Sequence, residues 1–205
     1  MQNPYDYYGI YRSCRDAAWR CLWDFGIDRL PVSVMSAARQ MGIHVVRNSE
    51  SVLKLRPDES GAAIYFNNHW HVIYDDRLPA EEARFVLAHE LGHILMGHEY
   101  KYAEARFDGS RKIKCEREAD MFAMRVLAPA FALHELQALD ADRIAALCRI
   151  PKSAAKSRAL RMAELEKRGK YYTSELEQKL RDRFEPYLAR ERASQSRAVP
   201  PQSPQ

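Results

Sequence analysis

One segment constrains the fold of this chain more than any other: residues 80–96 predict a long, largely buried helix with ionisable side chains in its middle. Acidic residues stand in its first turn, where the helix dipole favours negative charge, and Gly97 would end it. Its apolar positions are Phe85, Val86, Leu87, Leu91, Ile94 and Leu95. His89, Glu90 and His93 interrupt this apolar stretch. Because ionisable groups on a buried helix need partners, we expect a polar site here.

The interrupting residues form the pattern HExxH, His89-Glu90-Leu91-Gly92-His93. Histidines at i and i+4 lie one turn apart on one helix face, so both imidazoles can reach a single Zn²⁺ at about 2.0–2.1 Å. Glu90 points beside the metal, where a general base must lie. Gly92 weakens a helix by about 1 kcal/mol, so we expect another backbone to pack closely there. The alternative is a surface helix with two unrelated histidines, which the apolar surroundings disfavour.

A catalytic zinc site needs a third protein ligand, and residues 116–123 offer one on a second predicted helix. Glu116 and Asp120 are i and i+4, on one face of that helix. If Glu116 coordinates the metal, Asp120 can accept a hydrogen bond from the far nitrogen of a ligand histidine. We expect Glu118 to point elsewhere, into solvent. The competing third ligands are His98, His71, His69 and Glu118.

The rest of the chain predicts an α+β protein, mostly helical, with a small antiparallel sheet next to the HExxH helix. The runs 62–66 and 70–74 flank Asn67-Asn68 and predict a hairpin, because asparagine tolerates positive φ. Residues 43–46 predict a further short strand. Other helices are predicted at 6–25, 31–40, 112–127, 129–138, 142–148, 152–167 and 174–192. We expect a core at 1–128, a C-terminal helical region at 129–193 that packs on this core, and a disordered tail at 194–205.

Composition excludes several classes of protein. The 205 residues are 46% hydrophobic and 29% charged, which is enough to build a sizeable core. We expect a cytoplasmic protein without membrane contact, because no apolar run approaches the roughly 18–20 residues that span a bilayer and no secretory signal is evident. The net charge of +4 does not by itself indicate nucleic acid, and we expect no direct contact with it. Scattered cysteines predict reduced core thiols: Cys14, Cys21, Cys115 and Cys148.

Several segments together resemble the ImmA/IrrE family of zinc metallo-endopeptidases: the helix-then-strand entry at 30–46, the hairpin at 62–74, RFVLAHELGHIL at 84–95, and E-x-x-A-D-x-F-A at 116–123 with the Leu-Ala-Pro break at 127–129. The resemblance implies a zincin-like metallopeptidase core with one Zn²⁺ per chain. Carried over, the metal ligands are His89, His93 and Glu116, and the base is Glu90. Asp120 stands where the family more often has Asn, and neither this departure nor Val86 in place of a frequent Thr removes a ligand.

The same resemblance implies a function. Known family members are intracellular endopeptidases that act on helix-turn-helix transcriptional repressors. It therefore implies a zinc-dependent endopeptidase that hydrolyses a peptide bond in a regulatory protein of that kind. An electrophilic helper for the oxyanion is expected, and the candidates for oxyanion or substrate contacts are Tyr100, Tyr102, His98 and His71.

A different class of function stays open at this point: a DNA-associated, toxin–antitoxin or phage-type regulatory protein with a structural or sensory metal site. Glu90 discriminates between the two classes, because a purely structural zinc site has no need of a base. The sequence does not determine the substrate, the activating signal or the oligomeric state.

Overall fold

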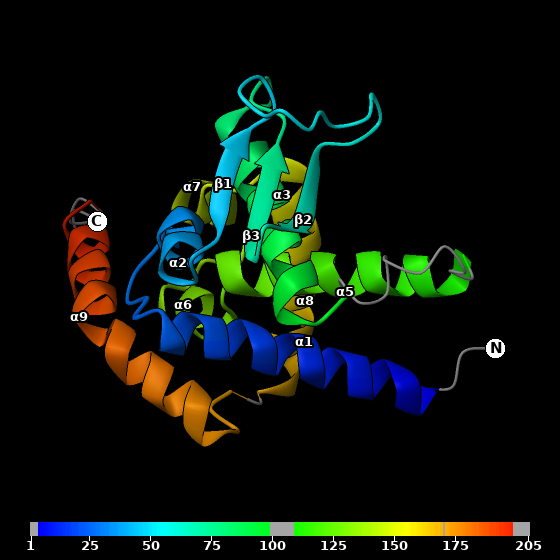
Figure 1. The fold of residues 1–205 in the computed structure, drawn as a ribbon. Helices are drawn as coiled ribbons and strands as arrows, with labels where there is room; N and C mark the ends of the chain where they lie inside the picture. Colours follow the sequence, from blue (N-terminus) through cyan, green and yellow to red (C-terminus); the bar gives the residue numbers. More distant parts are fainter. Residues whose placement is uncertain (1–3, 99–108, 170, 199–205) are drawn as a thin grey trace, which may run out of the picture.

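The structure, a computed structural model, describes residues 4–98, 109–169 and 171–198 of the chain. The described part is mostly helical, as predicted, with one small sheet (Figure 1). Its elements in chain order are α1 (Pro4–Asp24), α2 (Val34–Gln40), β1 (His44–Arg47), β2 (Gly61–Phe66), β3 (His69–Tyr74), α3 (Ala80–Leu95), α5 (Gly109–Leu127), α6 (Ala130–Glu135), α7 (Ala141–Cys148), α8 (Lys152–Arg168) and α9 (Glu175–Ala198).

The sheet has three strands in the order β1-β3-β2. Strands β2 and β3 pair antiparallel around the predicted turn, where Asn67 and Asn68 both take positive φ angles of 48° and 65°. Two consecutive positive φ angles match the twist of a tight hairpin, and asparagine adopts them at low cost. Strand β1 pairs parallel with β3. The predicted α+β fold is therefore confirmed, with a sheet that is mixed rather than purely antiparallel.

Helix α3 lies between the sheet and α5, and two glycines allow its close approach to both. A Cβ built on Gly92 would lie 3.0 Å from the Phe122 ring and 3.2 Å from the Cα of Ala119 on α5. The expected close backbone is therefore the α5 helix. On the other side, a Cβ on Gly61 would collide with Val86 of α3. The small residues bring three elements together around the middle of α3.

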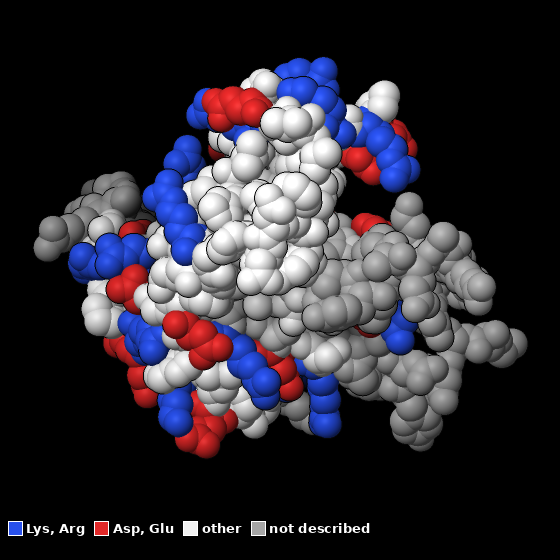
Figure 2. Space-filling view, viewed as in Figure 1, with Lys and Arg blue, Asp and Glu red and all other residues white. Residues whose placement is uncertain are grey.

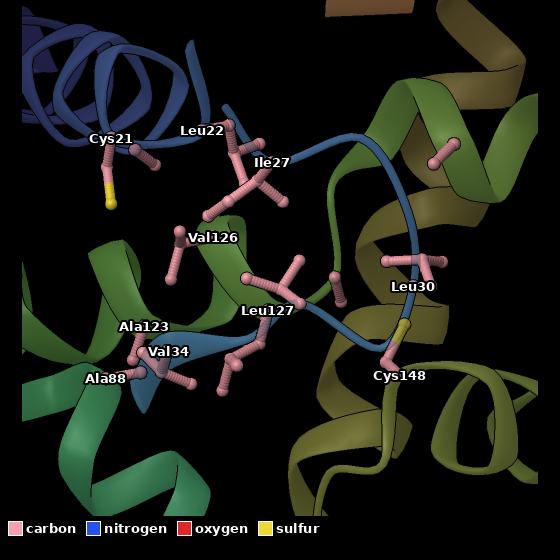
Figure 3. Close-up of a cluster of buried hydrophobic side chains, with 14 of the residues drawn as sticks. Cys21, Leu22, Ile27, Leu30, Val34, Ala88, Ala123, Val126, Leu127 and Cys148 are labelled. Carbon is pink, nitrogen blue, oxygen red and sulfur yellow. The ribbon is translucent and has the colours of Figure 1, made fainter. Parts of the chain in front are cut away.

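One hydrophobic core joins both ends of the described chain, and Figure 3 shows part of it. Leu22 of α1, Ala88 of α3, Leu127 of α5 and Cys148 of α7 all belong to it, and each is fully buried. The C-terminal helices contribute as well, since the ring of Phe184 on α9 packs edge-on against Phe131 of α6 with centroids 5.1 Å apart. Burial of α9 against the same core as the HExxH helix fixes the frame that holds α3 and α5.

The cysteines are free and buried, as predicted: Cys14, Cys21, Cys115 and Cys148. Burial disfavours the thiolate, and it raises the pKa of Cys14 to about 11 and those of Cys21 and Cys148 to about 12. These thiols therefore act as small apolar core residues.

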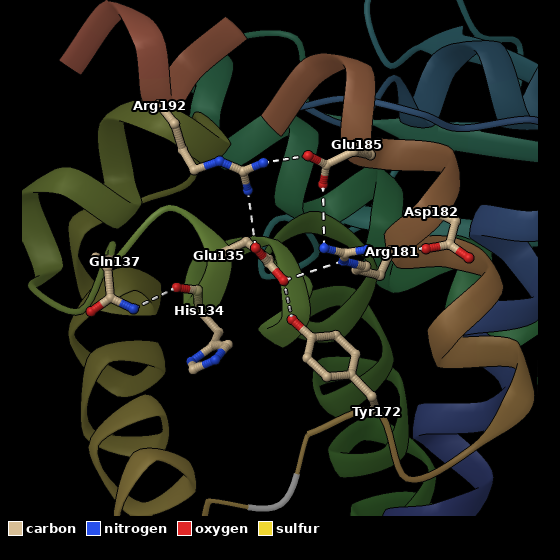
Figure 4. Close-up of polar contacts among 8 residues, drawn as sticks. All are labelled: His134, Glu135, Gln137, Tyr172, Arg181, Asp182, Glu185 and Arg192. Atoms are coloured by element: carbon tan, nitrogen blue, oxygen red, sulfur yellow. Dashed lines mark hydrogen bonds and ion pairs between the residues drawn. The ribbon is translucent and has the colours of Figure 1, made fainter. Parts of the chain in front are cut away.

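A polar cluster around Glu135 ties α9 to α6 (Figure 4). The Glu135 carboxylate accepts hydrogen bonds from the Tyr172 hydroxyl at 2.6 Å and from Arg192 at 3.0 Å, and it is 3.4 Å from Arg181. Helix α9 continues to Ala198. Residues 194–198 are therefore helical rather than part of the tail that the composition predicts, because the helix was already nucleated and anchored before the polar stretch begins.

None of the described helices combines the length and the apolar character needed to cross a bilayer.

Candidate metal centre

His89 and His93 direct the same ring atom, Nε2, toward a common point. They lie one turn apart on α3, and their Nε2 atoms are 2.9 Å apart. Glu116 on α5 brings its Oε2 atom to 3.1 Å from Nε2 of His89 and 3.5 Å from Nε2 of His93. All three potential ligand atoms lie within 4.8 Å of one another. The close packing of α3 on α5 at Gly92 is what brings the carboxylate within reach of the imidazoles.

This donor set suits a zinc ion. Two imidazoles and one carboxylate form one of the ligand sets of catalytic zinc, and ligand atoms about 2.0–2.1 Å from a tetrahedral zinc lie about 3.3 Å from one another. The three separations of 2.9, 3.1 and 3.5 Å bracket that value. The His93 side chain is only 9% exposed, whereas that of Glu116 is 42% exposed. Solvent can therefore reach the cluster from the side of Glu116.

Asp120 supports the first histidine. Its Oδ1 atom lies 2.8 Å from Nδ1 of His89, so the Nδ1–H group donates to the carboxylate and leaves Nε2 toward the cluster. Burial disfavours the imidazolium, but the hydrogen bonds to Asp120 and Glu116 outweigh burial and raise the pKa of His89 to about 9 in the metal-free protein. His89 therefore carries an additional proton at neutral pH, and this proton must leave when a metal binds.

Glu90 lies between the cluster and the edge strand β2. It is 8% exposed, and its carboxylate accepts a hydrogen bond from the backbone N–H of Ala63. A Cβ on Gly61 would come within 3.1 Å of its Oε1 atom, so the strand leaves room for this carboxylate only through a glycine. Burial raises the pKa of Glu90, while the neighbouring His89 and His93 lower it. A buried carboxylate beside a metal site is placed to take up and release a proton.

His98 and Glu118 form a second support that the sequence analysis did not predict. His98 is fully buried, with Nδ1 at 3.0 Å from Nδ1 of His93 and Nε2 at 2.8 Å from Oε2 of Glu118. The expectation that Glu118 is solvated is wrong: it is 8% exposed. Helix α5 is covered by α1 as well as by α3, so the face away from Glu116 is not a solvent face. His98 lies behind His93, on the side away from Nε2, which argues against direct contact with an oxyanion.

His69 and His71 do not face the cluster. Gly61 and Ala63 of β2 face α3. Ile64 and Phe66 lie on the other face of the strand, because side chains alternate between the two faces. Ile64 pairs with His71 and Phe66 pairs with His69. Both imidazoles therefore lie on the opposite face of the sheet, where the ring of His44 stacks on His71 at 5.0 Å and meets His69 at 5.2 Å. This position disfavours both histidines as the third ligand and His71 as an oxyanion or substrate contact. Tyr100 and Tyr102, the other candidates for oxyanion contacts, lie outside the described residues.

Comparison with known proteins identifies the family. The sequence model of the peptidase M78 family, described as the IrrE N-terminal-like domain, matches residues 38–160. The chain belongs to the M78 peptidase family. The match contains the sheet and the helices α3 and α5, and so every residue of the metal cluster. No curated protein matches the chain in a sequence comparison.

The M78 assignment and the site geometry agree on the kind of chemistry. The family is one of metal-dependent peptidases, and this member carries a cluster of two histidines and a glutamate suited to a metal ion. The resemblance inferred from the motifs is therefore confirmed, together with a metallopeptidase type of function.

Proposed function

We propose that this M78 family member is a zinc-dependent endopeptidase that hydrolyses a peptide bond in a regulatory protein, and that its substrate is a helix-turn-helix transcriptional repressor. The observation that carries the proposal is the convergence of His89, His93 and Glu116 with a buried carboxylate, Glu90, beside them. A purely structural metal site has no use for that additional carboxylate. The substrate class follows from the family resemblance of the motifs.

The residues divide the chemistry between them. A zinc ion held by His89, His93 and Glu116 would supply Lewis-acid activation of water and of the peptide carbonyl. Glu90 takes a proton from the attacking water and delivers it to the nitrogen of the leaving amine. Its raised pKa suits this double role, because a carboxylate that is too acidic would not hold the proton between the two transfers. Asp120 keeps His89 oriented throughout.

Strand β2 supports binding of an extended peptide. It is the edge strand of the sheet, and the Ala63 N–H that bonds Glu90 belongs to it. At its far end Tyr65 and Phe66 are 56% and 55% exposed. A peptide that pairs with this edge as an added strand would pass beside Glu90, with main-chain hydrogen bonds giving affinity and the exposed aromatic side chains contacting its residues.

The charge distribution on the face seen in Figure 2 gives no support to a DNA-binding function. On the face seen in Figure 2, lysine and arginine side chains alternate with aspartate and glutamate, and the sheet region between them is free of charged side chains. Binding to a phosphate backbone needs a basic stripe or patch. This face therefore favours contact with a protein over contact with DNA.

The test is incubation of the purified chain with the repressors encoded beside its gene, with and without a chelator, followed by mass spectrometry of fragments. We expect fragments that the chelator abolishes. Glu90→Gln should keep zinc, measured by metal analysis, and lose cleavage. Cleavage by that variant at the wild-type rate would refute the assignment of the base, and absence of bound zinc in the wild type would refute the metal centre.

A further inference from the structure

The two histidines of the metal cluster are supported in different ways. The Nδ1 atom of His89 contacts a carboxylate directly, at 2.8 Å from Asp120. The Nδ1 atom of His93 instead contacts a second imidazole, His98, at 3.0 Å, and that imidazole contacts the carboxylate of Glu118 at 2.8 Å. Each series of contacts ends on a carboxylate of α5, but the series behind His93 contains one additional residue, His98.

With Glu118 ionised and His98 neutral, the contacts assign the tautomers of His98 and His93. An ionised carboxylate only accepts hydrogen bonds, so Nε2 of His98 must carry a hydrogen that it donates to Glu118. Neutral His98 then has no hydrogen on Nδ1 and can only accept there. His93 must therefore donate from its own Nδ1, which leaves the lone pair of its Nε2 atom facing His89 and Glu116. The opposite tautomer of His93 would block the metal-facing atom with a hydrogen.

We propose that Glu118 and His98 are positioning residues of the metal centre: the chain Glu118–His98–His93 holds His93 in the tautomer whose Nε2 atom can bind a cation. This inference rests on the proposed metal centre and deepens it. Glu118 and His98 touch neither substrate nor metal in this assignment, and they act through His93.

The end of helix α3 explains how His98 reaches this place. Gly97 takes a positive φ of 66°, its N–H donates to the carbonyl of Ile94, and the N–H of His98 donates to the carbonyl of His93 at 2.8 Å. These bonds define a Schellman motif, in which the residue after the glycine packs its side chain over the last turn, usually as an apolar contact. Here both side chains in that contact are imidazoles, with ring centroids 5.0 Å apart.

The buried positions of His98 and Glu118 show that both residues are part of the protein interior. His98 is 0% exposed and Glu118 is 8% exposed. Burying an ionisable pair is unfavourable unless its hydrogen bonds are satisfied. Both ring nitrogens of His98 have a partner at hydrogen-bond distance. A structural pair of this kind could lie anywhere in the core, but this one contacts the far nitrogen of a proposed metal ligand.

The test measures zinc affinity by competition with a chromophoric chelator, on the full chain, for four variants. Glu118→Gln keeps the shape but offers both a donor and an acceptor, so it no longer dictates the tautomer of His98. His98→Leu removes the acceptor for His93, whereas His98→Asn keeps an acceptor close to the position of Nδ1. Glu166→Gln is the matched control, because Glu166 forms a similar 2.7 Å contact with His134 away from the cluster.

We expect Glu118→Gln and His98→Leu to lower the affinity for zinc about 10- to 100-fold, the range typical when a hydrogen-bond partner of a metal ligand is removed. His98→Asn should recover most of that loss, and Glu166→Gln should bind as the wild type does. Nitrogen chemical shifts of ¹⁵N-labelled histidines give a second measurement, which does not depend on enzymatic activity. They should show His93 changing from one tautomer to a mixture in Glu118→Gln.

Three outcomes would overturn the inference. They are wild-type zinc affinity in both Glu118→Gln and His98→Leu, equal losses in His98→Asn and His98→Leu, or an unchanged His93 tautomer in Glu118→Gln. If His98→Leu does not fold, Glu118→Gln and the nitrogen shifts still decide. A wild-type protein that binds no zinc would refute the proposed metal centre instead, so the two failures are distinguishable.

Discussion

Replacing Gly92 with alanine tests whether the contact between α3 and α5 sets the geometry of the metal centre. In an open helix position this change is stabilising by about 1 kcal/mol, because alanine is the better helix former. Here the added Cβ would lie 3.0 Å from the Phe122 ring, 3.2 Å from the Cα of Ala119 and 3.3 Å from its carbonyl oxygen. The neighbours include backbone, so the helices must move apart by a few tenths of an ångström. Overpacking of this kind costs about 1–3 kcal/mol.

The second effect outweighs the first, so we expect Gly92→Ala to be less stable than the wild type, by a net amount of about 1 kcal/mol. Urea unfolding of the metal-free protein measures this free energy. Zinc affinity should fall as well, because Glu116 moves with α5 away from the two imidazoles. As a control for helix propensity, the pair Leu160→Gly and Leu160→Ala changes an α8 position whose side chain is 74% exposed. A Gly92→Ala protein that gains stability as the Leu160 pair predicts would refute the packing argument.

Four further predictions follow from the site and the core. With its pKa at about 9, His89 should release close to one proton when zinc binds at pH 7. Calorimetry in buffers of different ionisation enthalpy measures this release. For the same reason, zinc affinity should rise with pH up to about 9. In the metal-free protein the raised pKa of His89 also stabilises the folded state. This contribution is complete below about pH 6.5 and is lost as the pH rises through about 9. A free energy of unfolding that increases over this pH range would contradict the prediction. Gly61→Ala should displace Glu90 and lower peptide hydrolysis while zinc stays bound, measured as kcat against metal content. Tyr172→Phe removes a 2.6 Å hydrogen bond to Glu135 and should lower the free energy of unfolding by about 1 kcal/mol with unchanged zinc affinity; a wild-type unfolding midpoint would show that α9 is held without it.

The helix that carries His89 and His93 could be predicted from the sequence because its pattern is local. The spacing of His89 and His93 places two imidazoles on one face of any α-helix, and the apolar residues around them require that face to be buried. The same holds for Glu116 and Asp120, which any helix would present together. The hairpin at Asn67-Asn68 was predictable for a similar reason, since its turn residues prefer the backbone angles that they adopt.

Other features depend on which surfaces pack together, and periodicity does not contain that information. Strand alternation places His69 and His71 on one face, but only the packing of α3 against Gly61 decides that this face points away from the metal cluster. Glu118 looked solvated because it lies off the face of Glu116. The long-range packing of α1 on α5 buries it.

The position of His98 depends on both the local sequence and the tertiary packing. The glycine that ends α3 is visible in the sequence, and the motif it forms places the next side chain over His93. That the side chain then meets Glu118 depends on α5 lying beside α3. The sequence by itself determined which imidazoles and carboxylates one helix can present together, because their spacing is shorter than two helical turns. Only the tertiary structure decided which carboxylates complete and support them, because those contacts join residues that are distant along the chain.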